Sequence, residues 1–149
     1  MTAGTSESWQ LYDKAGVTAL IDHNFPQARD DIGAFVIENL ADMTATVRLP
    51  IDNKFIRPGG SVSGPTMFKL ADISAWIAIL SEKGPMAVDA VTATMTINFL
   101  ARPAPADMIC HAHLLRLGRR LAMADCRIFS DGNDKMVAHA TCTYAMPVG

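Results

Sequence analysis

The segment between Ser63 and Gly84 constrains the fold most, because it reads as a long helix that is apolar on nearly every face. Ser63 is a favoured N-cap residue, and Pro65 falls in the first turn, where its missing N–H costs nothing. Gly84 and Pro85 end the pattern after about eighteen residues. A helix that is apolar all round is normally buried all round. Whatever fold the chain adopts must therefore cover this helix on both sides.

The two long faces of this helix differ in side-chain size when it is projected at 100° per residue. One face carries small residues with larger apolar flanks, namely Ala71, Ser74, Ala75, Ala78, Met67, Leu70 and Ile77. The opposite face carries Lys69, Asp72, Ile73, Trp76 and Leu80. Small side chains allow close approach to a sheet, so we expect a sheet on that side. Half of the 149 residues are hydrophobic, which favours a second copy of the chain as the cover on the other side.

Strand patterns lie on both sides of the helix in the sequence. Residues 32–40 and 43–49 predict a hairpin with its turn at Ala41-Asp42. Three or four long strands are predicted after the helix, at residues 87–102, 108–117, 121–130 and 135–146. The order of hairpin, long helix and antiparallel meander indicates an α+β domain with one sheet and one dominant helix.

The N-terminal part reads as helical, and nothing in the sequence divides the chain further. Residues 6–22 predict one or two short helices, and Phe25-Pro26 interrupts that pattern. We therefore expect a single domain over residues 1–149 with an N-terminal helical segment at about 6–30.

Composition excludes several classes of protein. Thirteen basic against fifteen acidic residues give a net charge of −2, which argues against nucleic-acid and membrane-surface binding. The longest nearly apolar run, Ile73 to Leu80, is too short to span a bilayer, and no signal peptide is visible.

Three cysteines cannot all pair within one chain, so we expect reduced thiols in a cytoplasmic protein. His111 and His113 lack further ligands at a suitable spacing, so no metal is expected.

Asp72 is the sharpest candidate for chemistry, because no other carboxylate lies between Asp52 and Glu82. One interpretation is a solvated position paired with Lys69 one turn earlier. The other is a carboxylate in a partly desolvated cleft, where it could act as a general base or a nucleophile. Both stay open at the level of the sequence.

Gly64 at the start of the long helix offers a backbone N–H at the positive end of the helix dipole. Such an amide can stabilise an oxyanion, although glycine there could also merely build a tight turn. No Gly-Lys-Ser/Thr follows, so a phosphate loop is disfavoured, and no Gly-x-Ser-x-Gly elbow is present.

Arginines outnumber acidic residues between residues 101 and 127, five against two. They are Arg102, Arg116, Arg119, Arg120 and Arg127. Without interleaved aromatic residues they are a poor nucleic-acid footprint, but they would suit a phosphorylated small molecule. Each of them could equally be a solvated residue on the outer face of a strand.

The ordered motifs resemble the hotdog-fold acyl-CoA thioesterases of the phenylacetate-degradation type. Residues 63–72 read Ser-Gly-Pro-Thr-Met-Phe-Lys-Leu-Ala-Asp, which is similar to that family's His-Gly-Gly followed by Leu-Ala-Asp. Further matches are Thr92 to Pro103, Leu117-Gly-Arg-Arg120 and Val137 to Tyr144. The resemblance covers roughly residues 35–147, and the ordered set is more specific than any single motif.

This resemblance implies an antiparallel sheet wrapped around one long central helix, in a homodimer whose two sheets join edge to edge, with dimers pairing further. By position, Asp72 is the catalytic carboxylate, Gly64 is the oxyanion-hole amide, and Thr92 is a hydroxyl that positions water or the carboxylate. Ser63 replaces the family's histidine and Arg57 its asparagine, which puts the orientation of the carboxylate in question. Pro65 replaces its second glycine, which leaves the Gly64 amide intact.

We therefore expect an acyl-CoA thioesterase that hydrolyses an aromatic or medium-chain acyl thioester. Substrate contacts are expected from Ser63, Arg57, Trp76, Arg119 and Arg120. Coenzyme A would enter only as part of the substrate, with no other cofactor. The alternative is a non-catalytic acyl-CoA or acyl-ligand binding protein that kept the fold after losing the His-Gly-Gly chemistry.

Overall fold

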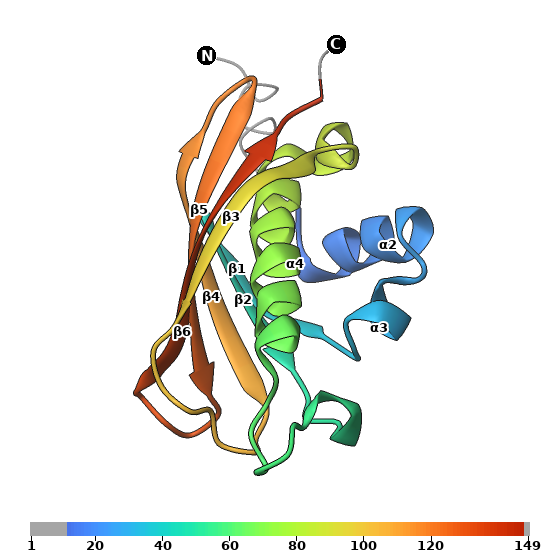
Figure 1. The fold of residues 1–149 in the computed structure, drawn as a ribbon. Helices are drawn as coiled ribbons and strands as arrows, with labels where there is room; N and C mark the ends of the chain where they lie inside the picture. The colour runs from blue at the N-terminus through green and yellow to red at the C-terminus, as the bar shows by residue number, and fades with distance from the viewer. Residues whose placement is uncertain (1–11, 148–149) are drawn as a thin grey trace.

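A six-stranded antiparallel sheet lies along one side of helix α4 in the computed structural model, which describes residues 12–147 (Figure 1). The strand order is β1-β2-β4-β5-β6-β3. The strands are β1 Val36–Ala41, β2 Thr44–Leu49, β3 Val91–Phe99, β4 Met108–Leu117, β5 Leu121–Ser130 and β6 Met136–Ala145. The helices are α2 Lys14–Asn24, α3 Ala28–Asp31 and α4 Gly64–Lys83, with 3-10 turns η1 Asn53–Phe55 and η2 Gly84–Ala87. This confirms the predicted α+β architecture with one antiparallel sheet and one central helix.

Helix α4 begins and ends where its capping residues predict. The Ser63 hydroxyl accepts a hydrogen bond from the Thr66 amide at 3.3 Å, and Pro65 occupies the first turn. Gly84 ends the helix with a φ of 64°, a conformation that favours glycine. The helix has 20 residues, slightly more than predicted.

The small face of α4 packs directly against the sheet, because the inner face of the sheet is also built from small residues. Buried residues on that inner face include Cys110, Ala112, Ala124, Cys126, Ala138, Ala140 and Cys142. The Cys126 thiol donates to the carbonyl of Ala71 at 3.5 Å, which shows how closely the helix approaches. The predicted contact between small face and sheet is therefore confirmed.

The opposite side of α4 is covered by the chain's own N-terminal helices and by η2 (Figure 1). Phe25, just after α2, meets the Trp76 ring edge-on at 6.2 Å between centroids. The indole N–H of Trp76 donates to the carbonyl of Ala87 in η2 at 3.2 Å. Ile73, Trp76 and Leu80 are all buried within a single copy. The prediction that a second copy must cover this part of the helix is therefore wrong.

Several element boundaries differ from the predicted ones. The first strand starts at Val36 instead of residue 32, because α3 and the turn at Gly33 occupy the preceding residues. The strand after the helix starts at Val91 instead of residue 87, because η2 and a turn prolong the helical region. The hairpin turn lies at Asp42 and Met43, and Met43 has a φ of 61°.

Helix α2 starts at Lys14, where Asp13 caps it by accepting from the Gly16 amide. Residues 6–11 of the predicted helical segment lie outside the described residues. Within residues 12–147, no helix is long and apolar enough to cross a membrane.

Candidate active site

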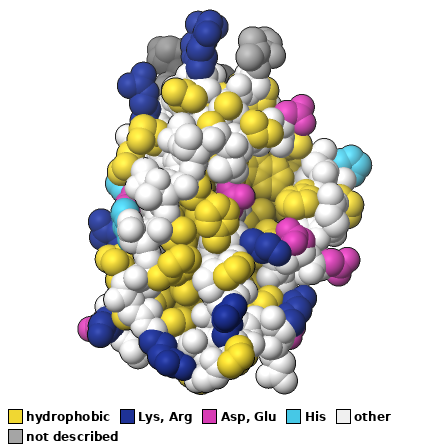
Figure 2. Space-filling view, in the orientation of Figure 1, with side chains coloured by type: hydrophobic (Ala, Val, Ile, Leu, Met, Phe, Trp, Pro, Cys, Tyr) yellow, Lys and Arg dark blue, Asp and Glu magenta, His cyan; other side chains and the backbone are white. Residues whose placement is uncertain are grey.

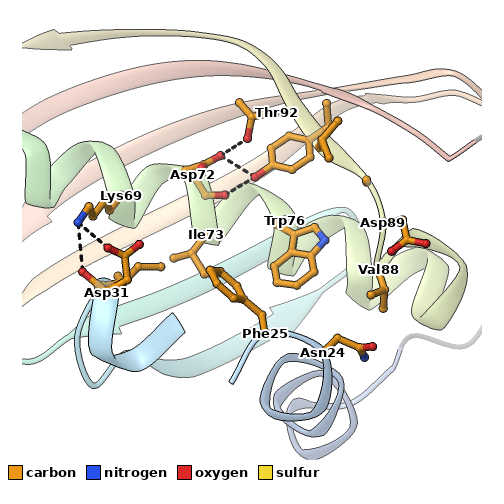
Figure 3. A pocket seen from close by; sticks show the side chains of 14 residues that line it. Asn24, Phe25, Asp31, Lys69, Asp72, Ile73, Trp76, Val88, Asp89 and Thr92 are labelled. Carbon is orange, nitrogen blue, oxygen red and sulfur yellow. Dashed lines mark hydrogen bonds and ion pairs between the residues drawn. The ribbon is translucent and has the colours of Figure 1, made fainter. Parts of the chain in front are cut away.

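Asp72 is half-buried in the middle of α4, where it lines a cavity of about 420 Å³ (Figure 3). The cavity lies between α4, the start of β3 and the segment that joins α2 to α3. Its apolar walls include Phe25, Ile73, Trp76 and Val88, and its polar lining includes Asn24, Asp31, Lys69, Asp89, Thr92 and Tyr144. Trp76, which the sequence predicts as a substrate contact, thus lies beside Asp72.

Two hydroxyl groups hold one oxygen of the Asp72 carboxylate. The Thr92 hydroxyl donates to Asp72 Oδ1 at 2.7 Å, and the Tyr144 hydroxyl donates to the same atom at 2.6 Å. Tyr144 Oη also lies 2.8 Å from the backbone carbonyl oxygen of Asp72. Within residues 12–147, Asp72 Oδ2 accepts no hydrogen bond. The carboxylate is therefore fixed at one oxygen and open at the other.

Lys69 is not the partner of Asp72, so the interpretation of Asp72 as part of a solvated ion pair is wrong. The Lys69 ammonium instead contacts the Asp31 carboxylate at 2.8 Å and the Asp31 carbonyl oxygen at 3.2 Å (Figure 3). This pair joins α4 to α3 along one side of the cavity.

A β-bulge at Ala93 turns Thr92 toward Asp72. The register of β3 against β6 shifts between Thr92 and Thr94, so that Thr92 lies opposite Tyr144. Met95 lies opposite Cys142, which is on the inner face of the sheet. Simple alternation from Met95 would point Ala93 inward and Thr92 outward, and the extra residue reverses that order. The bulge therefore converts Thr92 from an outer-face residue into a site residue.

Tyr144 also contacts Asp72, although the sequence analysis does not predict it as a site residue. It is only 4% exposed, and burial, together with the charge of Asp72, raises the pKa of its phenol. The phenol therefore stays protonated and acts as a donor at physiological pH. Alternation along β6 could have found it, because Ala140, Cys142 and Tyr144 share the inner face and Tyr144 alone is a strong donor.

Gly64 is the first residue of the same helix. It precedes Asp72 by eight positions, which is about 12 Å along the helix axis. It lines a separate apolar groove with Phe68 and Phe99, and a Cβ added at Gly64 would lie 3.2 Å from the Phe99 ring. Within residues 12–147, the Gly64 amide donates no hydrogen bond.

The remaining predicted substrate contacts lie outside the Asp72 cavity. The Ser63 hydroxyl caps α4 and is 2.7 Å from the Thr66 hydroxyl, and Arg57 lies in an exposed loop. Arg119 and Arg120 line a hollow of about 670 Å³ with Arg116 at the β4–β5 hairpin. This hollow shares no lining residue with the Asp72 cavity.

The other two arginines of the basic stretch are engaged elsewhere. Arg102 donates to the carbonyl of Gly59 at 2.7 Å, and Arg127 pairs with Asp125 at 3.1 Å. The structure therefore gathers three of the five arginines into one place.

The three cysteines are fully buried on neighbouring strands, beneath α4. Hydrogen bonds with Cys110 and Cys142, followed by burial, raise the pKa of the Cys126 thiol. A buried thiol with a raised pKa is a poor nucleophile. We therefore assign these residues to the packing of the core.

Comparisons with known proteins identify relatives in sequence and in fold. The sequence model of the thioesterase superfamily matches residues 59–144. A candidate thioesterase from Silicibacter sp. TM1040 superposes with a TM-score of 0.82 and 38% identity, covering 95% of this chain and 96% of that one. A candidate esterase from Pseudomonas aeruginosa is 28% identical over 79% of this chain and 87% of its own. A hypothetical thioesterase of Streptococcus pneumoniae, solved with coenzyme A, has a TM-score of 0.74 at 20% identity. The match covers 85% of this chain and 96% of that one.

Proposed function

Because the chain belongs to the thioesterase superfamily and has its hotdog fold, we propose that it hydrolyses an acyl-CoA thioester to a carboxylic acid and free coenzyme A. The observation that carries this proposal is the Asp72 carboxylate, held at Oδ1 by Thr92 and Tyr144 and open at Oδ2 beside an apolar cavity. A carboxylate in that setting can take a proton from water or attack a carbonyl carbon directly.

Thioester hydrolysis suits a site with few functional groups. A thiol has a pKa of about 8.5, so the thiolate leaves without a strong general acid. In the general-base route, a water oxygen adds to the carbonyl carbon while Asp72 Oδ2 takes the water proton. The C–S bond then breaks, the proton passes to the departing sulfur or to solvent, and the acid is released. The remaining requirement is a donor for the oxyanion of the tetrahedral intermediate.

The Gly64 amide can meet that requirement only from a second copy of the chain. Within one copy, Gly64 and Asp72 are about 12 Å apart along α4, too far to act on one carbonyl group. Asp72 contacts Thr92 at the start of β3, whereas Gly64 lies against Phe99 at the end of the same strand. An antiparallel two-fold pairing of two β3 strands would bring these two ends together. Asp72 of one protomer would then face Gly64 of the partner subunit.

The open edge of β3 supports this pairing. Within residues 12–147, β3 has β6 as its only strand neighbour, so its other edge is unpaired. Large apolar side chains beside this edge are exposed, with Val91 at 60%, Phe99 at 52% and Leu100 at 54%. Figure 2 shows hydrophobic side chains gathered on the face that carries β3 and α4. An unpaired apolar edge of this kind favours association, so we propose a homodimer that joins two β3 strands.

The substrate would lie with its acyl group against Phe25, Ile73 and Trp76 and its phosphates on arginine. The apolar walls and the volume of about 420 Å³ suit an aromatic or medium-chain acyl group. Arg116, Arg119 and Arg120 offer guanidinium groups for the phosphates of coenzyme A. The Streptococcus pneumoniae structure with coenzyme A supports this choice of thiol.

The test is a thiol-release assay over acetyl-, hexanoyl-, benzoyl- and phenylacetyl-CoA with the wild type and two matched variants. Asp72→Asn keeps the size of the side chain but removes the charge, and turnover should fall at least about a hundredfold. Asp134→Asn, in the exposed β5–β6 turn, is the control and should match the wild type. Full activity of Asp72→Asn would refute the proposal. Binding of these thioesters without any thiol release by the wild type would instead establish an acyl-CoA binding protein.

A further inference from the structure

The Tyr144 hydroxyl makes two contacts with one residue of α4. It is 2.6 Å from Asp72 Oδ1 and 2.8 Å from the Asp72 carbonyl oxygen. Tyr144 comes from β6, and its register partner in the sheet is Thr92 of β3. The helix carbonyl and the carboxylate are thus tied to the sheet through a single phenol.

The phenol can act only as a donor toward this carboxylate. An ionised carboxylate has no proton to give, and burial with the nearby Asp72 charge keeps the phenol protonated. A carboxylate oxygen has two lone pairs, and the Thr92 and Tyr144 hydroxyls engage both of those on Oδ1. Oδ2 keeps both of its lone pairs for an incoming water molecule or carbonyl carbon.

We propose that Tyr144 is a positioning residue which, with Thr92, holds Asp72 Oδ1 so that Oδ2 is the reacting atom. The assignment rests on the proposed hydrolysis of thioesters. Tyr144 touches Asp72 and acts through it, whereas Asp72 performs the chemistry. A rotated carboxylate would present either oxygen, so loss of the phenol should reduce the fraction of Asp72 that is aligned for reaction.

Tyr144→Phe is the variant that tests this role, because it removes the hydroxyl and keeps the buried ring. We expect kcat to fall roughly tenfold or more, since the lost hydrogen bond is charge-assisted, while KM changes less than about threefold. Lys69, Asp31 and Asp89, the other charged groups of the cavity, are the same in both proteins, so a loss in kcat with little change in KM reports on the alignment of Asp72.

Two further variants separate positioning from a loss of folding. Tyr12→Phe changes the other tyrosine of the chain, which lies outside the cavity, and should leave kcat and KM unchanged. Thr92→Val removes the second hydroxyl at nearly constant size. Because both hydroxyls bind one oxygen, the combined Thr92→Val and Tyr144→Phe variant should depart from the product of the two single effects. Wild-type kcat in Tyr144→Phe would overturn the assignment.

A measurement without turnover keeps this inference distinct from the proposed function. Crystal structures of the wild type and of Tyr144→Phe show the orientation of the Asp72 carboxylate directly. Without the phenol, the carboxylate should be rotated or should occupy more than one orientation. A single orientation identical to that of the wild type would refute the role of Tyr144 even in an active enzyme. A rotated carboxylate in a protein that releases no thiol would support the role and refute only the proposed hydrolysis.

Discussion

Mixing two inactive variants tests whether the site is shared between two copies of the chain. Asp72→Asn removes the proposed base, and Gly64→Pro removes the backbone N–H proposed to bind the oxyanion. Proline is tolerated at position 64, because the first residue of a helix has no intrahelical use for its N–H. Ser63 has φ −70° and ψ 151°, which is compatible with a following proline. Each variant alone should lose at least about a hundredfold in kcat.

The expected recovery follows from the geometry of the proposed dimer. If equal amounts of the two variants are unfolded, mixed and refolded, random pairing makes about half of the dimers mixed. In a mixed dimer, one site combines Asp72 of one protomer with Gly64 of the partner subunit, and both are intact. The other site carries both changes. Because about half of the dimers are mixed and one of their two sites is intact, the sample should have about a quarter of the wild-type activity per chain. If both residues served one site from the same chain, no site would be intact and activity would stay near zero.

The control for this experiment separates the lost amide from added bulk. Gly64→Ala keeps the N–H but places a Cβ at the same position, 3.2 Å from the Phe99 ring. Because Phe99 is half exposed, its ring can move, and Gly64→Ala should stay within about tenfold of the wild type. The assay is thiol release from the best substrate of the panel, with chain mass measured by light scattering before and after mixing. Absence of recovery in samples that contain mixed dimers would refute the shared site.

Two further predictions concern substrate affinity and pH. Replacing both Arg119 and Arg120 by alanine should raise KM for acyl-CoA about tenfold, because contacts with phosphate are lost. KM for the phosphate-free N-acetylcysteamine thioester should stay unchanged. Equal effects on KM for both substrates in steady-state assays would contradict this prediction. The hydrogen bond from Arg48 lowers the pKa of Asp131, so this carboxylate stabilises the fold above its usual titration range, and that contribution is lost as pH falls through its lowered pKa. Asp131→Asn should therefore unfold at a lower urea concentration than the wild type at pH 7, and the difference between the two urea midpoints should narrow in acid. A difference that does not depend on pH would contradict this origin of the stabilisation.

The long helix and the strands that follow it could be predicted because their signals are local. Ser63 and Gly84 determine the ends of α4 by hydrogen bonding and by backbone conformation, and both depend only on adjacent residues. The predicted strands at 108–117 and 121–130 have the same bounds as β4 and β5. Periodicity therefore predicted the architecture. Asp72 and Gly64 were candidates from their positions in and at the start of the helix, and the resemblance implied their catalytic roles.

The parts that could not be predicted depend on register and on distant contacts. Periodicity alone points Thr92 outward with Thr94 and Thr96, and only the bulge at Ala93 turns it to Asp72. The resemblance, and not the alternation, singled out Thr92. Asp31 lies 38 residues before Lys69, so nothing local indicated that it would take the lysine from Asp72. The Phe25–Trp76 contact is likewise distant in sequence.

The residues proposed to act on the thioester and some of the residues proposed to contact its acyl group come from different parts of the sequence. Asp72, Gly64, Thr92 and Tyr144 all fall within residues 59–144, the segment that matches the thioesterase superfamily. Asn24, Phe25 and Asp31 line the same cavity but precede that segment, on and beside the N-terminal helices. These helices also bury the side of α4 that carries Trp76, which would otherwise be open to water. A change in the N-terminal helices can therefore reshape the proposed acyl pocket without moving the groups proposed to act on the thioester bond.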